Sequence, residues 1–199
     1  MSAAPRRGSY AKGRERREAI LVAANELFAA QGFRGASLAA IAARVGLSEA
    51  GLLHHFPSKE HLLLELLDLR HERDGERVAR AIANHTAMLD ALLALCRDNQ
   101  RSPGLVRLFT ILAAESVDAD HPAHAWTAER YAGLRHQLAD RLRAEQQAGR
   151  VAEGLDPDLV APQILAMFDG LQLQWLLAPG DVDMSAVLAD FLARLERVS

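Results

Sequence analysis

The sequence has 199 residues, half of them hydrophobic and few of them aromatic, and this composition is typical of soluble all-helical proteins. The net charge of −3 hides an asymmetry: residues 1–59 contain nine Lys/Arg and four Asp/Glu, whereas residues 60–199 contain fourteen and twenty-two. A basic segment followed by an acidic remainder predicts a polyanionic partner for the first segment only.

The single cysteine, Cys96, excludes an internal disulfide and fits a reducing compartment. It lies in the apolar run ALLALC, which favours a buried thiol over the alternative of a redox sensor. No uncharged apolar run reaches the length of a membrane span, and the apolar stretch near the N-terminus lacks a cleavage signal. These features predict a cytoplasmic protein that binds no membrane.

Residues 1–11 are small, polar and basic. They predict a flexible basic arm, which either is a solvated tail or reaches along a phosphate backbone or minor groove of DNA. Residues 12–59 are expected to form a helical unit whose first helix, about 12–30, has an apolar stripe and ends at Gly32. Its basic start, which includes Arg17, opposes the helix macrodipole. This favours nearby phosphates, with arginines on a solvated face as the alternative.

The stretch 37–60 predicts a helix-turn-helix. Its first helix has an apolar face at i, i+3, i+4 and i+7, formed by Leu38, Ile41, Ala42 and Val45. Gly46 then provides a turn residue with positive φ, and Ser48 can cap a second helix that buries Leu52 and Phe56. Two short helices joined in this way are the arrangement that places a recognition helix in the major groove of DNA.

Written as S-L-x-x-I-A-x-x-V-G-L-S-x-x-x-L-x-H-H-F-P-S-K-E-x-L-L, the same stretch resembles the DNA-binding signature of the TetR-type bacterial repressors. The resemblance is close from Arg14 to about Leu67 and otherwise covers a helical pattern, with a looser likeness near 169–184. It implies an all-α fold with an N-terminal three-helix DNA-binding domain, residues 12–59, and a helical effector-binding and dimerisation domain, residues 60–199. The family usually has Thr and Tyr in its recognition helix where this chain has Gly51 and Leu53, which provide no hydroxyl.

Double-stranded DNA is therefore the expected partner of the recognition helix. The resemblance implies that Glu49, Ala50 and Leu53 face bases, and that Gly51, His55 and Lys59 lie on phosphates. By residue type, Glu49 can accept from a cytosine amino group and Leu53 can pack on a thymine methyl. For Lys59, a solvent-exposed side chain is the alternative. The expected DNA-binding residues are Arg17, Ser37, Ser48, Glu49, Ala50, Gly51, Leu53, His54, His55 and Lys59.

A long helix from Ser58 to about residue 83 should connect this domain to further helices at about 86–99, 103–118, 123–148, 157–178 and from a cap at Asp183 to near Val198. The helix at 157–178 is apolar around most of its circumference, so it needs more than one apolar neighbour. We expect a homodimer on a palindromic operator, with an internal helix of a monomer as the alternative. The predicted interface residues are Phe168, Leu171, Trp175, Leu188, Phe191, Leu192 and Leu195.

The resemblance also implies a small-molecule effector bound among the helices after Lys59. Core packing is the alternative for each candidate lining residue: Met88, Leu92, Phe109, Leu112, Trp126, Tyr131, Met167, Phe168, Gln172 and Trp175. Few charges are expected on these faces, which favours an apolar or amphipathic ligand. The predicted function is a transcriptional repressor released by such a ligand. The alternative is a DNA-binding dimer whose body is only an oligomerisation module.

No sequence feature supports catalysis or a cofactor. The motifs G-x-S-x-G, the P-loop and the dinucleotide-binding glycine run are absent from the sequence. His121 and His124 have acidic neighbours but not the spacing of H-E-x-x-H, and a proline-containing loop does not preorganise metal ligands. We therefore expect a non-enzymatic protein in which these histidines have a loop role.

Overall fold

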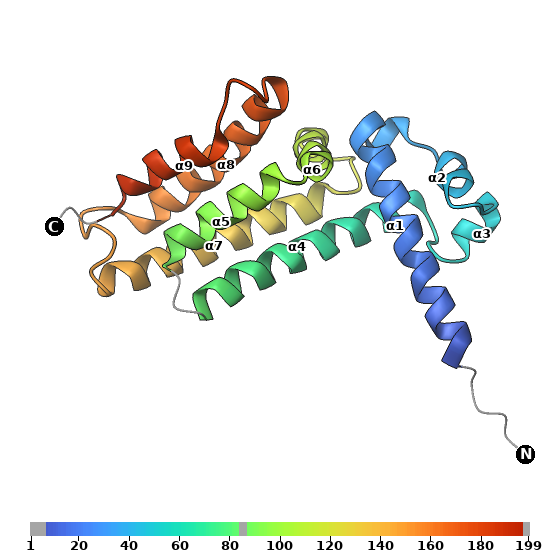
Figure 1. The fold of residues 1–199 in the computed structure, drawn as a ribbon, viewed down its shortest axis with the longest axis horizontal. Helices are drawn as coiled ribbons and strands as arrows, with labels where there is room; N and C mark the ends of the chain where they lie inside the picture. Colours follow the sequence, from blue (N-terminus) through green and yellow to red (C-terminus); the bar gives the residue numbers. More distant parts are fainter. Residues whose placement is uncertain (1–6, 84–86, 197–199) are drawn as a thin grey trace, which may run out of the picture. The chain divides into compact units, whose positions relative to one another are not determined.

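The computed structural model describes residues 7–83 and 87–196. Regular structure in these ranges is helical apart from one isolated antiparallel bridge between Val151 and Glu196, so the all-α prediction is confirmed (Figure 1). None of the described helices is long and apolar enough to cross a membrane. The helices of the described ranges are α1 (Arg7–Gly35), α2 (Leu38–Arg44), α3 (Glu49–Leu53), α4 (Lys59–Ala83), α5 (Met88–Gln100), α6 (Pro103–Glu115), α7 (His124–Gln147), α8 (Pro157–Leu177) and α9 (Met184–Ala193).

The chain divides into two compact units, residues 1–69 and residues 70–199. The first unit contains α1, α2, α3 and the start of α4, and the second contains the remainder of α4 and the helices from α5 to α9. The change of unit falls inside α4, because this helix continues without interruption from Lys59 to Ala83. One helix therefore belongs to both units.

Side-chain caps start four of the helices, and those at Ser48 and Asp183 were predicted from the sequence. Side-chain oxygens of Ser37, Ser48, Asp156 and Asp183 accept hydrogen bonds from backbone N–H groups in the first turns of α2, α3, α8 and α9. These N–H groups have no partner within their helix, and a cap of this kind stabilises a helix by about 1 kcal/mol. Gly46, between α2 and α3, has a φ of 69°, which confirms the left-handed turn residue predicted there.

The first helix begins earlier than expected. It starts at Arg7 rather than near Lys12, so residues 7–11 belong to α1, while residues 1–6 of the predicted arm lie outside the described residues. Gly32 has a φ of 71° and a ψ of 172°, which interrupts the helix at the predicted stop. The last helix is shorter than expected and ends at Ala193 instead of near Val198.

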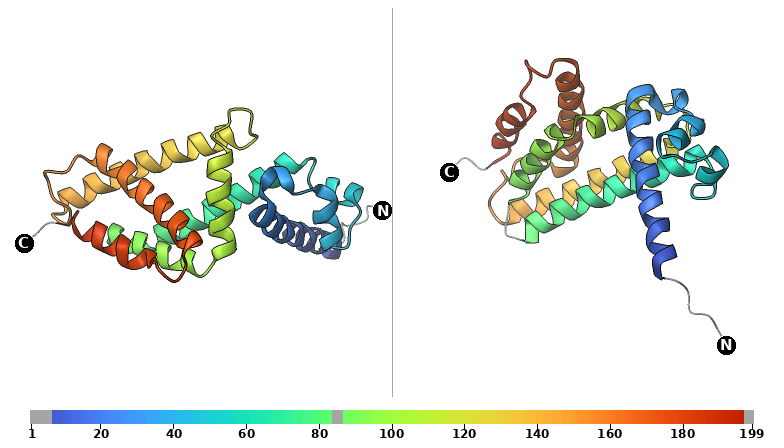
Figure 2. Two further views of the ribbon diagram at one scale, coloured as in Figure 1. Left: turned by 90° about the horizontal axis from the view of Figure 1, so that it is seen from above. Right: turned by 45° about the vertical axis from the view of Figure 1, so that its right-hand side comes forward.

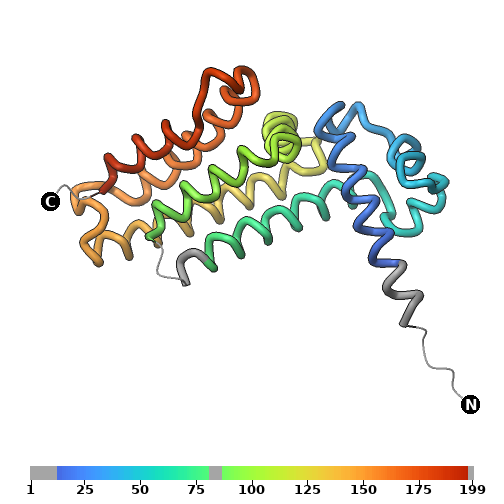
Figure 3. The backbone as a smooth tube through the Cα atoms, in the orientation of Figure 1, coloured from blue at the N-terminus to red at the C-terminus, as the bar shows by residue number. Residues whose placement is uncertain are grey.

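In the second unit α5 packs against α9, α7 packs against α8, and α8 also packs against α6 and α9. The chain reverses direction between α7 and α8 and again between α8 and α9 (Figure 3). In contrast, α6 crosses the direction of α7 steeply (Figure 2). The core of this unit is apolar and comes mainly from α5, α7, α8 and α9, and it includes Cys96, which confirms the buried thiol.

Five residues expected at a dimer interface belong to this core instead. Each is at most 9% exposed within the single chain. Their own chain already covers these side chains, so they offer little surface for a second contact, and their predicted interface role stays a prediction. Of the expected set, only Trp175 and Phe191 keep partial exposure. The five buried residues are Phe168, Leu171, Leu188, Leu192 and Leu195.

Candidate nucleic-acid interface

Backbone hydrogen bonds hold the turn between α2 and α3. The N–H groups of Val45 and Leu47 both donate to the carbonyl of Ala42, at 3.1 and 2.9 Å. On the far side of the turn, the Ser48 hydroxyl oxygen accepts from the N–H of Gly51 at 3.1 Å. Because donors on both sides of Gly46 are satisfied within a few residues, α3 has a defined orientation on α2.

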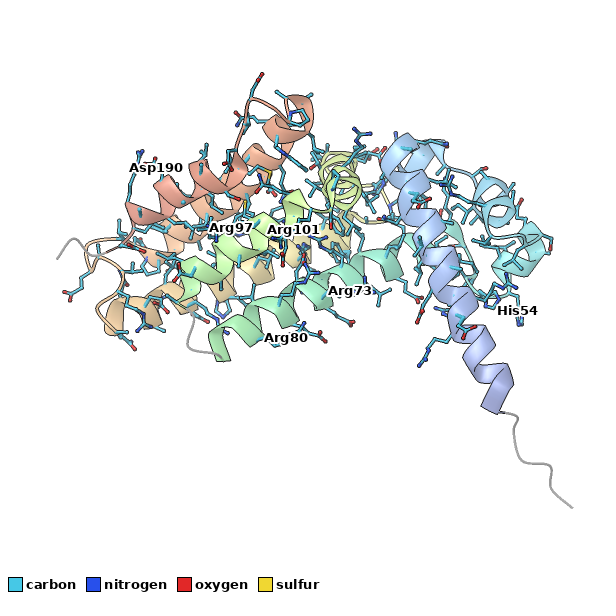
Figure 4. The ribbon with its side chains drawn as sticks, viewed as in Figure 1. His54, Arg73, Arg80, Arg97, Arg101 and Asp190 are labelled. Atoms are coloured by element: carbon cyan, nitrogen blue, oxygen red, sulfur yellow. The ribbon has the colours of Figure 1, made fainter. Side chains whose placement is uncertain are left out.

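One side of α3 is buried and the other is open. Leu52 is completely buried, and Phe56, just beyond the helix, is 1% exposed. Glu49, Ala50 and Leu53 are exposed, and the ring of His54 extends outward from the end of α3 (Figure 4). The residues predicted to face bases thus share an accessible side of a helix that is anchored from behind.

Gly51 lies against the cap of α3. A Cβ at this position would lie 3.3 Å from the Ser48 Oγ and 3.8 Å from side-chain atoms of Leu47. A side chain at this position would therefore need only a small shift of the Ser48 hydroxyl, so packing does not by itself require glycine here. The predicted phosphate contact of Gly51 stays a prediction.

Arg17 connects α1 to the junction of α3 and α4. One of its guanidinium nitrogens donates to the carbonyl of His55 and another to the carboxylate of Glu65. Its Cζ atom also lies 4.2 Å from the centre of the Phe56 ring. These contacts make Arg17 a positioning residue for the end of α3, and a phosphate contact would have to share the same guanidinium.

Lys59 binds the end of α1. Its ammonium donates to the carbonyls of Phe33 and Ala36, both at 2.9 Å, and lies 4.5 Å from the centre of the Phe33 ring. These carbonyls follow the interruption of α1 at Gly32. An ammonium has three donors, so these bonds leave one for the predicted phosphate contact.

His55 lies among positive groups. Its pKa is lowered from the ordinary value of 6.5, first by burial and then by the charges of His54, Arg17 and Arg16. The imidazole is therefore neutral at pH 7 in the free protein. The clustering of these cationic groups around the end of α3 favours an anionic partner at this edge.

Sequence reasoning missed residues that matter for this site. Arg16 donates to the carbonyl of Val45 at the end of α2, at 3.2 Å, and Glu65 accepts from Arg17. The two contacts join residues 29 and 48 positions apart along the chain. No local pattern reveals a partner at that distance.

The predicted effector-site residues divide into two groups in the second unit. One group packs in or against hydrophobic core: Met88, Leu92, Leu112, Met167, Phe168 and Trp175. For these six, the structure shows the core packing that was the alternative. Phe109, Trp126 and Tyr131 lie beside charged side chains, and Gln172 is partly buried on α8.

Two of these aromatic residues have an arginine beside them, which the expectation of few charges did not anticipate. The Cζ of Arg70 lies 5.6 Å from the centre of the Phe109 ring, and the Cζ of Arg130 lies 5.6 Å from the Trp126 ring. The two arginines come from α4 and α7, which are separated by two intervening helices in the sequence. Only tertiary packing brings them to these aromatic residues.

The loop between α6 and α7 contains the histidines considered as metal ligands. The His121 ring accepts from the N–H of Ala123 at 3.2 Å and lies 3.8 Å from the carboxylate of Glu115, and the His124 ring lies 2.8 Å from the carbonyl of Ser116. Over residues 7–83 and 87–196, no group of three or more His, Cys, Asp and Glu could hold a metal ion.

Comparison with known families matches both units. The family described as "Bacterial regulatory proteins, tetR family" matches residues 20–66, and "BetI-type transcriptional repressor, C-terminal" matches residues 84–197. The second match alone covers more than half of the chain. The chain belongs to the tetR family. It is therefore a DNA-binding transcriptional regulator, and α2 and α3 lie within the matched residues 20–66.

Relatives match most of this tetR-family chain. The HTH-type transcriptional repressor Rv1474c of Mycobacterium tuberculosis is 28% identical over 173 residues, 87% of this chain and 89% of the relative. The nucleoid occlusion factor SlmA of Sodalis glossinidius is 32% identical over 173 residues, 79% of this chain and 81% of the relative. A transcriptional regulator from Saccharomonospora viridis, solved in complex with choline, aligns with a TM-score of 0.80 at 24% identity over 94% of this chain and 100% of that one. The likeness to this last structure shows the fold alone.

Proposed function

We propose that this tetR-family protein is a repressor that reads a palindromic operator with α3 as a dimer and releases it when a small molecule binds the second unit. The observation that carries the proposal is the division of α3 into an anchored side and an open side. Leu52 holds one side, and the other presents Glu49, Ala50 and Leu53. Reading of base edges in the major groove requires this arrangement.

The open side of α3 suggests how bases would be read. Glu49 is its acidic group and would accept from the amino group of cytosine, while Leu53 and Ala50 would pack on thymine methyls. A good contact of this kind discriminates against a wrong base by about 1–3 kcal/mol. We expect a sequence preference set by one carboxylate and by apolar contacts, since Gly51 and Leu53 supply no hydroxyl.

Selection of bound sequences from a random DNA pool tests whether α3 reads the operator. The preferred sequence of the natural protein is compared with those of Glu49→Gln and Leu53→Ala, and each variant should change the preference at particular positions. Arg107→Gln, an exposed change on α6 in the second unit, is the control and should leave the selected sequence unaltered. An identical selected sequence for all four proteins would show that α3 does not read the operator.

We propose that the open side of α8 and α9 forms the dimer interface. Leu173 and Leu177 lie one turn apart on α8 and are 49% and 77% exposed, and Val187 on α9 is 44% exposed. Because α8 packs against α9, these residues are candidates for one apolar surface. A second copy of the chain would cover this surface with two-fold symmetry and place two copies of α3 on two half-sites.

Ligand control is supported by the continuity of α4 and by the neighbour of similar fold that was solved with choline. A ligand that favours one arrangement of α4 in the second unit would change how α3 meets DNA. A coupling of about 1–3 kcal/mol lowers DNA affinity about 5- to 150-fold. The test is a screen for compounds that release the selected operator, followed by calorimetry. By reciprocity, the operator must weaken effector binding by the same factor.

A second candidate function comes from the relatives named nucleoid occlusion factors. In this alternative the second unit dimerises and contacts another macromolecule, and no small effector exists. Tight operator binding that no compound in the screen changes would favour this alternative. Release by a compound that calorimetry shows to bind the second unit would favour the ligand-controlled repressor.

A further inference from the structure

The second unit contains an arginine, Arg130, that is partly buried and has no acidic ion-pair partner among the described residues. We propose that Arg130 binds a carboxylate group of the effector. This inference rests on the proposed function, because it names the chemical class of the ligand which that function leaves open. It also narrows the expectation of an apolar or amphipathic ligand to an anionic one.

The neighbouring Arg70, in contrast, forms an ion pair with an acidic side chain of the same unit. Its Nε donates to the Asp74 carboxylate at 2.6 Å, another nitrogen donates to the side-chain oxygen of Asn99, and its Cζ lies over the Phe109 ring. The side chains of Arg70 and Asp74 are only 12% and 14% exposed. The charge of Arg70 is therefore neutralised inside the protein.

Arg130 has neutral partners instead. One guanidinium nitrogen contacts Nδ1 of His71, and the Cζ lies 5.6 Å from the centre of the Trp126 ring. His71 must accept through Nδ1 in this contact, so its ring is neutral and supplies no counter-charge. Burial is the largest influence on Arg130 and lowers its pKa from the ordinary value. A partly buried cation without a carboxylate partner destabilises the free protein.

The acidic groups near Arg130 are already engaged. Asp74 pairs with Arg70, and Asp169 accepts a hydrogen bond from the Tyr131 hydroxyl at 2.6 Å. Both carboxylates act on Arg130 through their charge, but neither forms an ion pair with it. The two guanidinium groups of Arg70 and Arg130 are matched in number by the two carboxylates, but only Arg70 has one of them as a direct ion-pair partner among the described residues. The second oxygen of Asp74, Oδ1, is buried and has no hydrogen-bond partner in the described structure.

These features favour a carboxylate over a quaternary ammonium such as choline. A guanidinium presents a planar pair of donors that matches a carboxylate, whereas the same positive charge repels an ammonium. Trp126 could otherwise attract a cation, but Arg130 already occupies the region over its ring. The free oxygen of Asp74 would accept from a hydroxyl or amide N–H on the same ligand.

Thermal unfolding of ligand-free variants tests whether the charge of Arg130 is reserved for a ligand. Arg130→Gln keeps a donor for His71 and removes the charge, so the melting temperature should stay unchanged or rise. Arg70→Gln breaks an ion pair and should lower it. Arg135→Gln, an exposed change on the same helix as Arg130, is the control for loss of a charge. A loss for Arg130→Gln as large as that for Arg70→Gln would make Arg130 a structural charge and overturn the proposal.

Calorimetry with matched probes tests the ligand class. The probes are octanoate and phenylacetate, their primary amides, and phenyltrimethylammonium. At least one carboxylate should bind about tenfold or more tightly than its amide, since hydrogen bonds to charged groups are the stronger ones. Arg130→Gln should remove this preference and Arg135→Gln should keep it. Binding of no carboxylate, equal binding of acid and amide, or an unchanged preference in Arg130→Gln would each overturn the proposal.

The operator-release screen separates this inference from the function on which it rests. If neutral or cationic compounds release the operator and carboxylates do not, ligand control stands and the carboxylate assignment fails. If a carboxylate binds through Arg130 and operator affinity stays the same, the site stands and ligand control fails.

Discussion

The contacts of Lys59 predict that its ammonium stabilises the DNA-binding unit in the absence of DNA. Lys59→Met keeps a flexible stem and removes the donors to the carbonyls of Phe33 and Ala36, each at 2.9 Å. A hydrogen bond to a charged group contributes about 1.5–3 kcal/mol, and the contact with the Phe33 ring about 0.5–1 kcal/mol. Because Lys59 is only partly buried, water will replace part of these contacts. We therefore expect a loss of about 2 kcal/mol in local stability.

Amide hydrogen exchange of peptides from α1 to α3 measures this loss without DNA. A decrease of about 2 kcal/mol corresponds to exchange about 30-fold faster for amides that exchange through opening of this unit. Arg14→Met is the matched control, because Arg14 is 74% exposed and its removal takes the same charge from a solvated position. Exchange in Lys59→Met equal to that of the natural protein would refute the structural role.

Salt dependence of operator binding then separates the structural role from a phosphate contact. Each neutralised phosphate contributes about 0.9 to the slope of log affinity against log salt concentration. If the third ammonium proton contacts a phosphate, Lys59→Met should lower this slope by about 0.9. If Lys59 only holds the end of α1, affinity should fall while the slope stays the same. A variant with unchanged slope, affinity and exchange would contradict both roles.

Further predictions concern protonation, thiol chemistry and assembly. The pKa of His55 is lowered in the folded protein, so the unfolded chain takes up a proton more readily, and the stability of the first unit should fall as pH drops below 6.5. Amide hydrogen exchange should show this loss, and His55→Gln should weaken its dependence on pH. Burial raises the pKa of Cys96 to about 11, so its thiol should stay protonated and the native protein should resist iodoacetamide at neutral pH. Rapid labelling without denaturant would contradict this prediction. In sedimentation, Leu177→Glu should give a folded monomer, whereas Leu188→Glu should unfold the second unit; a folded dimer for Leu177→Glu would place the interface elsewhere.

The sequence correctly predicted the roles of those residues whose interactions are with near neighbours in the chain. Ser48 caps α3 because its hydroxyl reaches an N–H three residues away, and Gly46 turns the chain because a side chain disfavours its φ of 69°. Leu52 is buried and Leu53 is exposed because adjacent positions of a short helix point to different sides. Covalent geometry and short-range hydrogen bonding thus suffice to define the recognition helix, and the family's signature lies in this same stretch.

The faces of α8 and α9 could not be assigned in this way. A helix that is apolar around most of its circumference carries no local signal of which side faces inward, so the neighbouring helices decide. Packing against α5, α7 and each other buries Leu188 and Leu192 and leaves Leu177 exposed. The sequence alone therefore determined that a large apolar surface exists, and only tertiary packing determined which residues remain for a partner.

The contacts of the charged side chains in the two units could not be predicted from the sequence either. Sequence alone showed that residues 1–59 are basic, because a net charge is a sum over residues and needs no coordinates. Tertiary structure decided which groups these charges contact: Arg17 and Lys59 bind carbonyls within the first unit. Arg130 has His71 and Trp126 as neighbours but no carboxylate ion-pair partner in the part of the chain that the structure describes. The reason is physical, since ion pairs and hydrogen bonds require approach within a few ångströms. Residues far apart in the chain reach that distance only when the helices pack.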